Sequence, residues 1–150
     1  MIGSLTEDEI RAVLLRNVVG RIGCGDGRKT YVVPVNYVFD GRFIVAHSLE
    51  GLKIRMMRKN PAVCFEVDEM QDYNNWRSVI TWGIFQELKE ERERYEAMKL
   101  LTQKMIHMKV SRDAISRMIS LREMRGVDSG SDKPVIYRIV IKEMSGRYEE

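Results

Sequence analysis

A histidine–serine pair followed by a cluster of basic residues is the stretch of this sequence best suited to chemistry. In FIVAHSLEGLKIRMMRK, His47 and Ser48 end an apolar run, Gly51 follows, and Lys53 is the first of four basic residues. Free N–H groups and the dipole at the start of a helix favour a phosphate, and a nearby lysine adds a positive charge. With Ser48 as the N-cap of a helix, the stretch predicts a phosphate site.

The same cluster has two other interpretations. On composition alone, a solvated basic helix face is the commoner explanation, although Arg55 or Arg58 could give a phosphate a bidentate contact. A nucleic-acid surface is disfavoured, because Tyr73 and Trp76 are the only nearby exposed aromatic candidates and no stacking series interleaves the charges. The formal net charge of +3 does not demand a polyanionic partner.

A proline lies inside the strongest strand-like run, YVVPVNYVF at residues 31–39. Proline cannot donate to a strand ladder, so it belongs at an edge, a bulge or a gap in a sheet. Alternation places Pro34 and Asn36 on one face and Val35 and Tyr37 on the other. Pro34 marks a bulge beside a solvated Asn36, or the strand is opened for a planar ligand with polar edges.

Few other residues favour a specific chemistry. His47 and His107 lack cysteines or carboxylates at metal-ligand spacing, so no metal site is expected. No Gly-x-Ser-x-Gly elbow is present, and no side chain is singled out as catalytic. Trp82-Gly83 is unusual within a strand, because glycine weakens a strand unless something approaches closely, and the tryptophan could wall a pocket.

The predicted strands and helices determine how these residues are positioned. Their order along the sequence predicts one small β-barrel with helices packed outside it. Glycines and Asp40-Gly41 provide hairpin turns, and Thr6 with Glu9 forms a capping box that begins a helix. Helical patterns also cover 49–59 and 90–125, with a break near Ser111. Strands are predicted at 18–24, 31–39, 42–46, 62–67, 78–88 and 135–144.

The bulk composition fits a single domain over residues 1–150. The sequence is 44% hydrophobic and 31% charged, and no apolar run approaches membrane-spanning length. The polar, acidic start is unlike a signal peptide, so a cytoplasmic location without a membrane partner is expected. Cys24 and Cys64 are predicted to be buried free thiols in a reducing compartment.

Several motifs in order give the sequence a family resemblance. They are Pro-Val-Asn-Tyr, an Asp-Gly hairpin, His-Ser-x-x-Gly-x-Lys, Asn-Pro before a strand with Cys-Phe-Glu, and Ser-Val-x-x-x-Gly. The sequence thereby resembles the pyridoxamine 5′-phosphate oxidase-like FMN-binding split barrels, most closely the nitroimidazole-resistance (Nim-type) subgroup. The match covers about residues 18–101 and the last strand.

The resemblance implies a mainly β fold with flanking α-helices, a six-stranded antiparallel split β-barrel, and a homodimer with flavin between the subunits. FMN is expected, with FAD as the alternative, since no Gly-x-Gly-x-x-Gly pyrophosphate fingerprint is present. By resemblance, the ring lies against one strand, the phosphate on a second segment, and further residues line the ring or reach it from the partner subunit. These groups are Pro34, Val35, Asn36 and Tyr37; His47, Ser48 and Lys53; Trp82 and Gly83; and Trp76 to Ser78.

The resulting functional hypothesis is an FMN-dependent oxidoreductase acting on a small molecule, with a nitroimidazole-type reductase as the specific form. The alternative is a non-catalytic flavin- or haem-binding carrier or sensor, which is favoured if Trp82 or residues 109–125 fill the space over the ring. Residues 109–125 and the following GVDSGSDKP fit the family pattern loosely. The basic substrate-binding residues of true pyridoxamine phosphate oxidases have no clear counterparts, so vitamin B6 oxidation is not expected.

Overall fold

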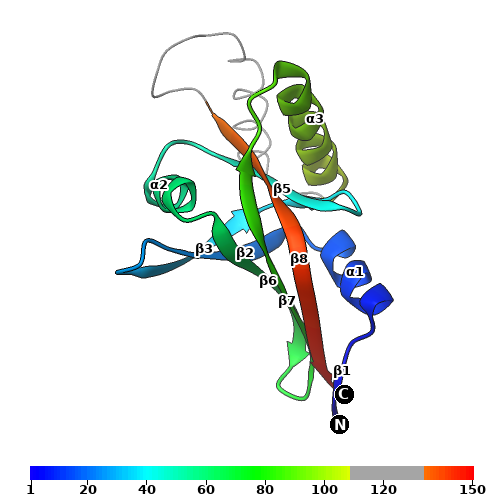
Figure 1. Cartoon of the computed structure of the whole chain (residues 1–150). Coiled ribbons are helices and arrows are strands. Elements are labelled where there is room, and N and C mark those ends of the chain that lie inside the picture. The colour runs from blue at the N-terminus through cyan, green and yellow to red at the C-terminus, as the bar shows by residue number, and fades with distance from the viewer. Residues whose placement is uncertain (109–133) are drawn as a thin grey trace.

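The computed structural model of the chain describes residues 1–108 and 134–150. Within these residues it forms eight strands and three helices (Figure 1). In chain order they are β1 (Ile2–Ser4), α1 (Glu7–Arg16), β2 (Val19–Gly25), β3 (Thr30–Asn36), β4 (Val38–Phe39), β5 (Phe43–Ser48), α2 (Leu52–Lys59), β6 (Ala62–Asp72), β7 (Asn75–Glu87), α3 (Glu91–His107) and β8 (Val135–Glu149).

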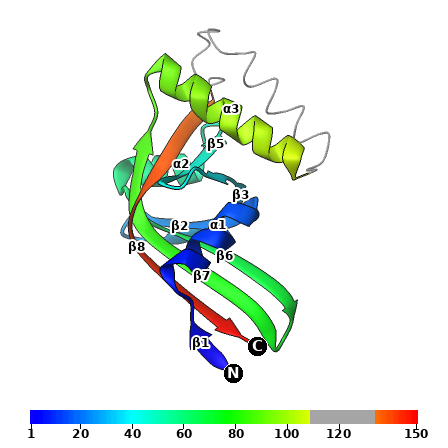
Figure 2. The same ribbon diagram turned by 90° about the vertical axis from the view of Figure 1, so that its right-hand side faces the viewer.

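The strands form one antiparallel sheet with the order β3-β2-β6-β7-β8-β5-β4, and β1 pairs with β8. All six predicted strands are present, which confirms the mainly β split-barrel fold with flanking helices. β6, β7 and β8 extend beyond their predicted ends, because polar residues such as Gln71 and Asn75 conceal the strand pattern there. The pairing of β1 with the end of β8 brings the two termini together (Figures 1 and 2).

The local signals for turns and caps are confirmed. Gly27 and Gly41 adopt φ angles of 89° and 94° in the hairpins β2–β3 and β4–β5, where positive φ favours glycine. Thr6 caps α1, and Glu9 completes the capping box. The predicted helical piece at 115–124 lies outside the described residues.

The predicted strand 31–39 is divided at Tyr37, and this division opens the barrel. β3 pairs with β2, whereas β4 pairs with β5 at the opposite end of the sheet order. The Tyr37 N–H still donates to the Val18 carbonyl at 3.0 Å, so the two edges meet at this residue. Beyond it β3 and β5 are not paired with each other, and the expected full closure of the ladder is not reached.

The core lies on the concave side of the sheet, where α1 packs (Figure 2). Tyr37 is fully buried there, with its ring 4.9 Å from that of Phe65 in an edge-to-face contact, and its hydroxyl donates to the Leu14 carbonyl of α1 at 2.7 Å. A second apolar cluster packs α3 against β4, β5 and β8. No helix within residues 1–108 and 134–150 is long and apolar enough to cross a membrane.

Candidate functional site

The free edge of β3 presents unpaired backbone groups to the split. Asp26 donates its N–H to the Lys29 carbonyl, and Tyr37 donates its N–H to the Val18 carbonyl. These two bonds fix which residues of β3 bond to β2. Residues directly opposite each other in an antiparallel pair alternate between bonded and non-bonded pairs, so the odd-numbered residues of β3 bond to β2. The N–H and C=O of Asn36 and the C=O of Pro34 therefore point away from β2. Because proline has no backbone N–H, Pro34 leaves no donor unpaired at this edge.

The facing edge of β5 is arranged in the same way. Asp40 donates its N–H to the Phe43 carbonyl, so the odd-numbered residues of β5 direct their backbone groups toward the β4 side. β4 begins only at Val38, which pairs with Val45. His47 lies beyond that pair, and its N–H and C=O consequently point into the split. Within the described residues, the split is thus bordered by unpaired backbone groups of Asn36 on one side and of His47 on the other.

The His47 side chain has an unsatisfied buried atom. Its Nδ1 is buried and has no hydrogen-bond partner among residues 1–108 and 134–150. Burial, and to a lesser extent the positive charge of Lys53, lowers the pKa of His47 to about 4, so the imidazole is neutral at pH 7. A buried polar atom without a partner is costly, and a ligand atom that bonds it removes that cost.

Lys53 is the one residue of the basic cluster that is both partly buried and without an ion pair in the described part of the chain. Burial lowers the pKa of its ammonium group. Arg58, by contrast, bonds Glu50 at 2.7 and 2.8 Å and Glu87 at 2.9 and 3.0 Å, which withdraws it from the proposed bidentate role. Lys53 is therefore the candidate anion ligand of the basic cluster, and the other basic residues of the cluster are surface charges.

The predicted helix cap is wrong in one detail. Ser48 is the last residue of β5, and its hydroxyl donates to the Leu49 carbonyl at 2.7 Å. The N-cap of α2 is Gly51, which offers no side-chain cap. The N-cap of α2 therefore lies three residues after the predicted one, and no side chain caps the first N–H groups of the helix. Ser48 belongs to β5 and precedes the helix.

The neutral state of His47 gives a test in pH. The unfolded chain takes up the histidine proton near pH 6.5, whereas the folded chain resists it until about pH 4. The stability from the neutral imidazole is therefore complete above pH 6.5 and is lost as the pH falls toward 4. Between pH 7 and pH 4.5, urea unfolding of the parent should lose about 2 kcal/mol more than that of His47→Gln.

His107→Gln, at the exposed end of α3, is the matched control and should follow the parent at both pH values. Equal losses in the parent and His47→Gln would contradict the buried, neutral histidine.

The predicted residues of β3 divide between two faces as alternation requires. Val35 and Tyr37 face the core, and the buried Tyr37 side chain is occupied in holding α1. Pro34 and Asn36 lie on the outer face of the sheet. The side chains of Val35 and Tyr37 therefore face away from the outer face, and their backbone groups are directed toward β2.

The predicted residues of β7 do not meet the split within one chain. Trp76, Ser78 and Trp82 point to the outer face, and Trp82 is 39% exposed. Strands β2 and β6 lie between β7 and β3, a separation of about 14 Å at three strand spacings. On the other side only β8 lies between β7 and β5, but Trp82 is opposite Glu143 of β8 whereas His47 is opposite Ile136, so the two are far apart along that strand. Gly83 faces inward at a register shift in the β7–β8 pair, where an added Cβ would lie 2.4 Å from the Val140 carbonyl oxygen. The close neighbour of this glycine is strand β8.

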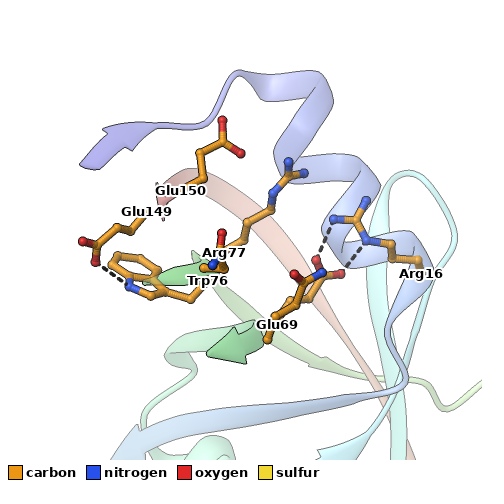
Figure 3. A pocket seen from close by; sticks show the side chains of 8 residues that line it. Arg16, Glu69, Trp76, Arg77, Glu149 and Glu150 are labelled. Carbon is orange, nitrogen blue, oxygen red and sulfur yellow. Dashed lines mark hydrogen bonds and ion pairs between the residues drawn. The ribbon is translucent and has the colours of Figure 1, made fainter. Parts of the chain in front are cut away.

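Trp76 pairs with Glu149 at the C-terminal end of β8, whereas His47 pairs with Ile136 near the start of that strand. It borders a polar cavity of about 410 Å³ and donates its indole N–H to Glu149 at 3.0 Å. Arg16 donates to Glu69 at 2.6 Å on the opposite wall (Figure 3). These contacts hold the cavity walls in place.

The two cysteines are free, as predicted. Cys24 is buried beneath α2, with its sulfur 3.9 Å from that of Met56, and burial raises the pKa of its thiol. Cys64 is only partly buried and faces outward on β6. A residue that the sequence did not single out, Lys104 of α3, has a buried amine against the Tyr37 ring. The sequence did contain a signal for this burial: Lys104 lies between Leu101 and Met105 and so borders the apolar face of the helix.

Comparison with known proteins agrees with this architecture. The model of the pyridoxamine 5′-phosphate oxidase family matches residues 6–148, and the chain belongs to that family. An uncharacterised protein of Rhizobium meliloti is 31% identical over 104 residues, which are 67% of this chain and 69% of that protein.

Solved structures share the fold. A FAD-binding protein from Mesorhizobium loti is 28% identical, covers 100% of this chain and 99% of its own, and superposes with a TM-score of 0.76. A candidate 5-nitroimidazole antibiotic resistance protein from Bacteroides thetaiotaomicron is 19% identical, with coverages of 100% and 92% and a TM-score of 0.70.

Proposed function

We propose that the chain is a flavin-dependent oxidoreductase that holds FMN in the split between β3 and β5 and acts on a small molecule. The observation that carries the proposal is the pair of facing strand edges, at Asn36 and His47, beside Lys53, all without partners among the described residues. A planar, polar-edged ring with a phosphate supplies the partners that this set of groups lacks. Family membership and the FAD-binding relative support the same class of ligand.

Each group has a role that follows from its chemistry. The N–H of Asn36 and that of His47 can donate to ring oxygen and nitrogen atoms, and the adjacent carbonyls accept from ring N–H. Lys53 neutralises the phosphate, and the buried Nδ1 of His47 gains a polar partner. When bound, the flavin supplies the hydride or electron chemistry, and the protein supplies orientation and electrostatics. FMN is preferred because the chain carries no pyrophosphate fingerprint.

A homodimer completes the site in this proposal. The outward stripe of β7 carries Trp82 and Ile84, which are 39% and 38% exposed, in the same row as Ser78. Exposed apolar rows of this kind favour association. A second copy can bring Trp76, Ser78 and Trp82 to a split that they cannot reach within their own chain.

The reductase and the carrier differ in whether a bound reduced flavin is open to an electrophile. Trp82 lies on the outer face of β7 and does not fill the split of its own chain, but a second copy can bring its Trp82 there, so Trp82 does not decide between the two functions. Residues 109–125, the other candidate cover, lie outside the described residues. A nitro compound is the proposed substrate class, in line with the resemblance to Nim-type proteins.

The test is stopped-flow reoxidation without oxygen. The loaded protein is reduced with one equivalent of dithionite and mixed with 2-methyl-5-nitroimidazole, and recovery of the visible flavin band is followed. A reductase restores the band faster than the same concentration of reduced free FMN does. Recovery no faster than that of free FMN would reject turnover of this substrate class and favour the carrier.

A further inference from the structure

Arg58 joins the loop before α2 to a strand of the sheet. The loop, residues 49–51, connects β5 to α2, and Leu49 at its start is 53% exposed, so apolar packing does little to fix it. Glu50, in the middle of the loop, accepts two hydrogen bonds from the Arg58 guanidinium, at 2.7 and 2.8 Å. These bonds tie the loop to the last turn of α2.

The same arginine is also bonded to the sheet. Its guanidinium donates to Glu87, the last residue of β7, at 2.9 and 3.0 Å. The backbone fixes the end of α2 against this strand as well, since the Phe85 N–H donates to the Pro61 carbonyl just after the helix at 2.8 Å. Arg58 therefore extends from an anchored helix end and links the loop, through Glu50, to β7.

The geometry of this bridge distinguishes it from an isolated surface ion pair. Isolated exposed pairs contribute little, whereas a guanidinium that forms paired bonds to a carboxylate holds it in a defined orientation. Here Nη1 and Nη2 bond the two oxygens of Glu50, and Nε and Nη2 bond those of Glu87. The bonds from Arg58 lower the pKa of Glu87, which keeps that carboxylate charged at neutral pH.

The loop that the bridge holds leads directly into the proposed phosphate site. Gly51 is the N-cap of α2, no side chain caps the first N–H groups, and Lys53 lies in the first turn. A Cβ at Gly51 would meet nothing closer than the Leu49 carbonyl at 4.0 Å, so close packing does not restrict the loop backbone there. A loop that is ordered only when the ligand binds costs affinity, and a loop held in place beforehand avoids that cost.

We propose that Arg58 is a positioning residue for the phosphate of the flavin, which acts by fixing the loop through Glu50 and does not itself contact the ligand. This inference rests on the proposed function, in which Lys53 neutralises the phosphate. It also gives Glu50 a favourable role in the binding of an anion, although the charge of a nearby carboxylate repels an anion.

The test compares binding of FMN with that of riboflavin, which has the same ring and no phosphate, by fluorescence titration of full-length variants. Arg58→Ala should bind FMN about fivefold more weakly than the parent does, and riboflavin within about twofold. Glu50→Ala should weaken FMN binding by a similar factor, although it removes a negative charge. Lys59→Ala removes the neighbouring exposed cation and should leave both affinities within about twofold of the parent.

The double variant of Arg58 and Glu50 should bind FMN no more weakly than either single variant, because both changes break the same bridge. FMN binding by Glu50→Ala that is as tight as that of the parent, or tighter, overturns the inference, because the charges would then act only through their field. Since Glu50 lies in an exposed loop, this variant decides the question even if Arg58→Ala does not fold.

Two further outcomes would also overturn the role of Arg58 and leave the proposed function intact. One is an equal loss of FMN and riboflavin affinity in Arg58→Ala, which a general loosening of the fold would explain. The other is an equal loss of FMN affinity in Arg58→Ala and Lys59→Ala, which surface charge would explain. A parent chain that binds neither FMN nor riboflavin rejects the proposed function, and the role of Arg58 falls with it.

Discussion

Lys53→Ala is expected to weaken FMN binding by about 10- to 100-fold, with little change in the free energy of unfolding. A hydrogen bond from a charged donor contributes about 1.5–3 kcal/mol, which corresponds to this range. Lys53 is partly buried and has no carboxylate partner among the described residues, so its removal breaks no ion pair in the free chain. The affinity is measured by fluorescence titration of FMN, and the stability by urea unfolding without ligand.

Lys59→Ala is the matched control, because Lys59 is exposed at the other end of the same helix and carries the same charge. It should leave the affinity within about twofold of the parent, since exposed charges are largely screened. If Lys53→Ala binds FMN as tightly as Lys59→Ala does, the phosphate does not lie at Lys53.

Gly83→Ala is expected to destabilise the fold by about 2–3 kcal/mol through overpacking. A Cβ at this position would lie 2.4 Å from the Val140 carbonyl oxygen and 2.7 Å from a methyl group of Ile139. The carbonyl belongs to the backbone of β8, which is paired on both sides and cannot retreat without distorting the sheet. The change is measured as a lower urea midpoint at an unchanged slope.

Gly51→Ala is the comparison, because its Cβ would meet nothing closer than the Leu49 carbonyl at 4.0 Å and its φ of −177° suits any residue. Its effect on unfolding should stay below about 0.5 kcal/mol, as the gain in chain stiffness offsets small losses at the cap. If both variants unfolded at the parent midpoint, β8 would not approach Gly83 as described.

The sequence predicted the structure best where a short stretch of residues specifies its own conformation and the fold uses that conformation. The β3 run of apolar and aromatic residues, the glycines with positive φ and the Thr6 capping box each specify a local conformation, and the structure has all of them. The alternation of Pro34 and Asn36 against Val35 and Tyr37 also holds, because the period of a strand is fixed by its pleat.

Features that depend on contacts distant in the sequence were not predictable. The division of one long strand at Tyr37 follows from its two halves pairing with β2 and β5, which no local pattern reveals. The cap assigned to Ser48 failed because a serine at a strand end can bond its neighbouring carbonyl as readily as it caps a helix. Lys104 was missed because its burial is decided by the docking of α3.

The separation of the β7 residues from the split shows the limit of motif-based assignment. A motif orders residues along the chain, and the sheet order then places β2 and β6 between β3 and β7. The resemblance anticipated a partner subunit for Trp76 to Ser78. The topology places Trp82 on the same outer face, so in the proposed homodimer it too would come from the partner subunit, and it gives Gly83 a structural explanation in β8.

The most direct test of the central claim is a titration of the purified, desalted chain with FMN, followed by its visible absorption spectrum and by sedimentation. The proposal predicts a shifted, structured two-band flavin spectrum that survives desalting, with one FMN per chain in a species of twice the chain mass. A single intense Soret band in the protein as purified would instead indicate haem. A chain that remains colourless and leaves the FMN spectrum unchanged would contradict the assignment of the split as a flavin site.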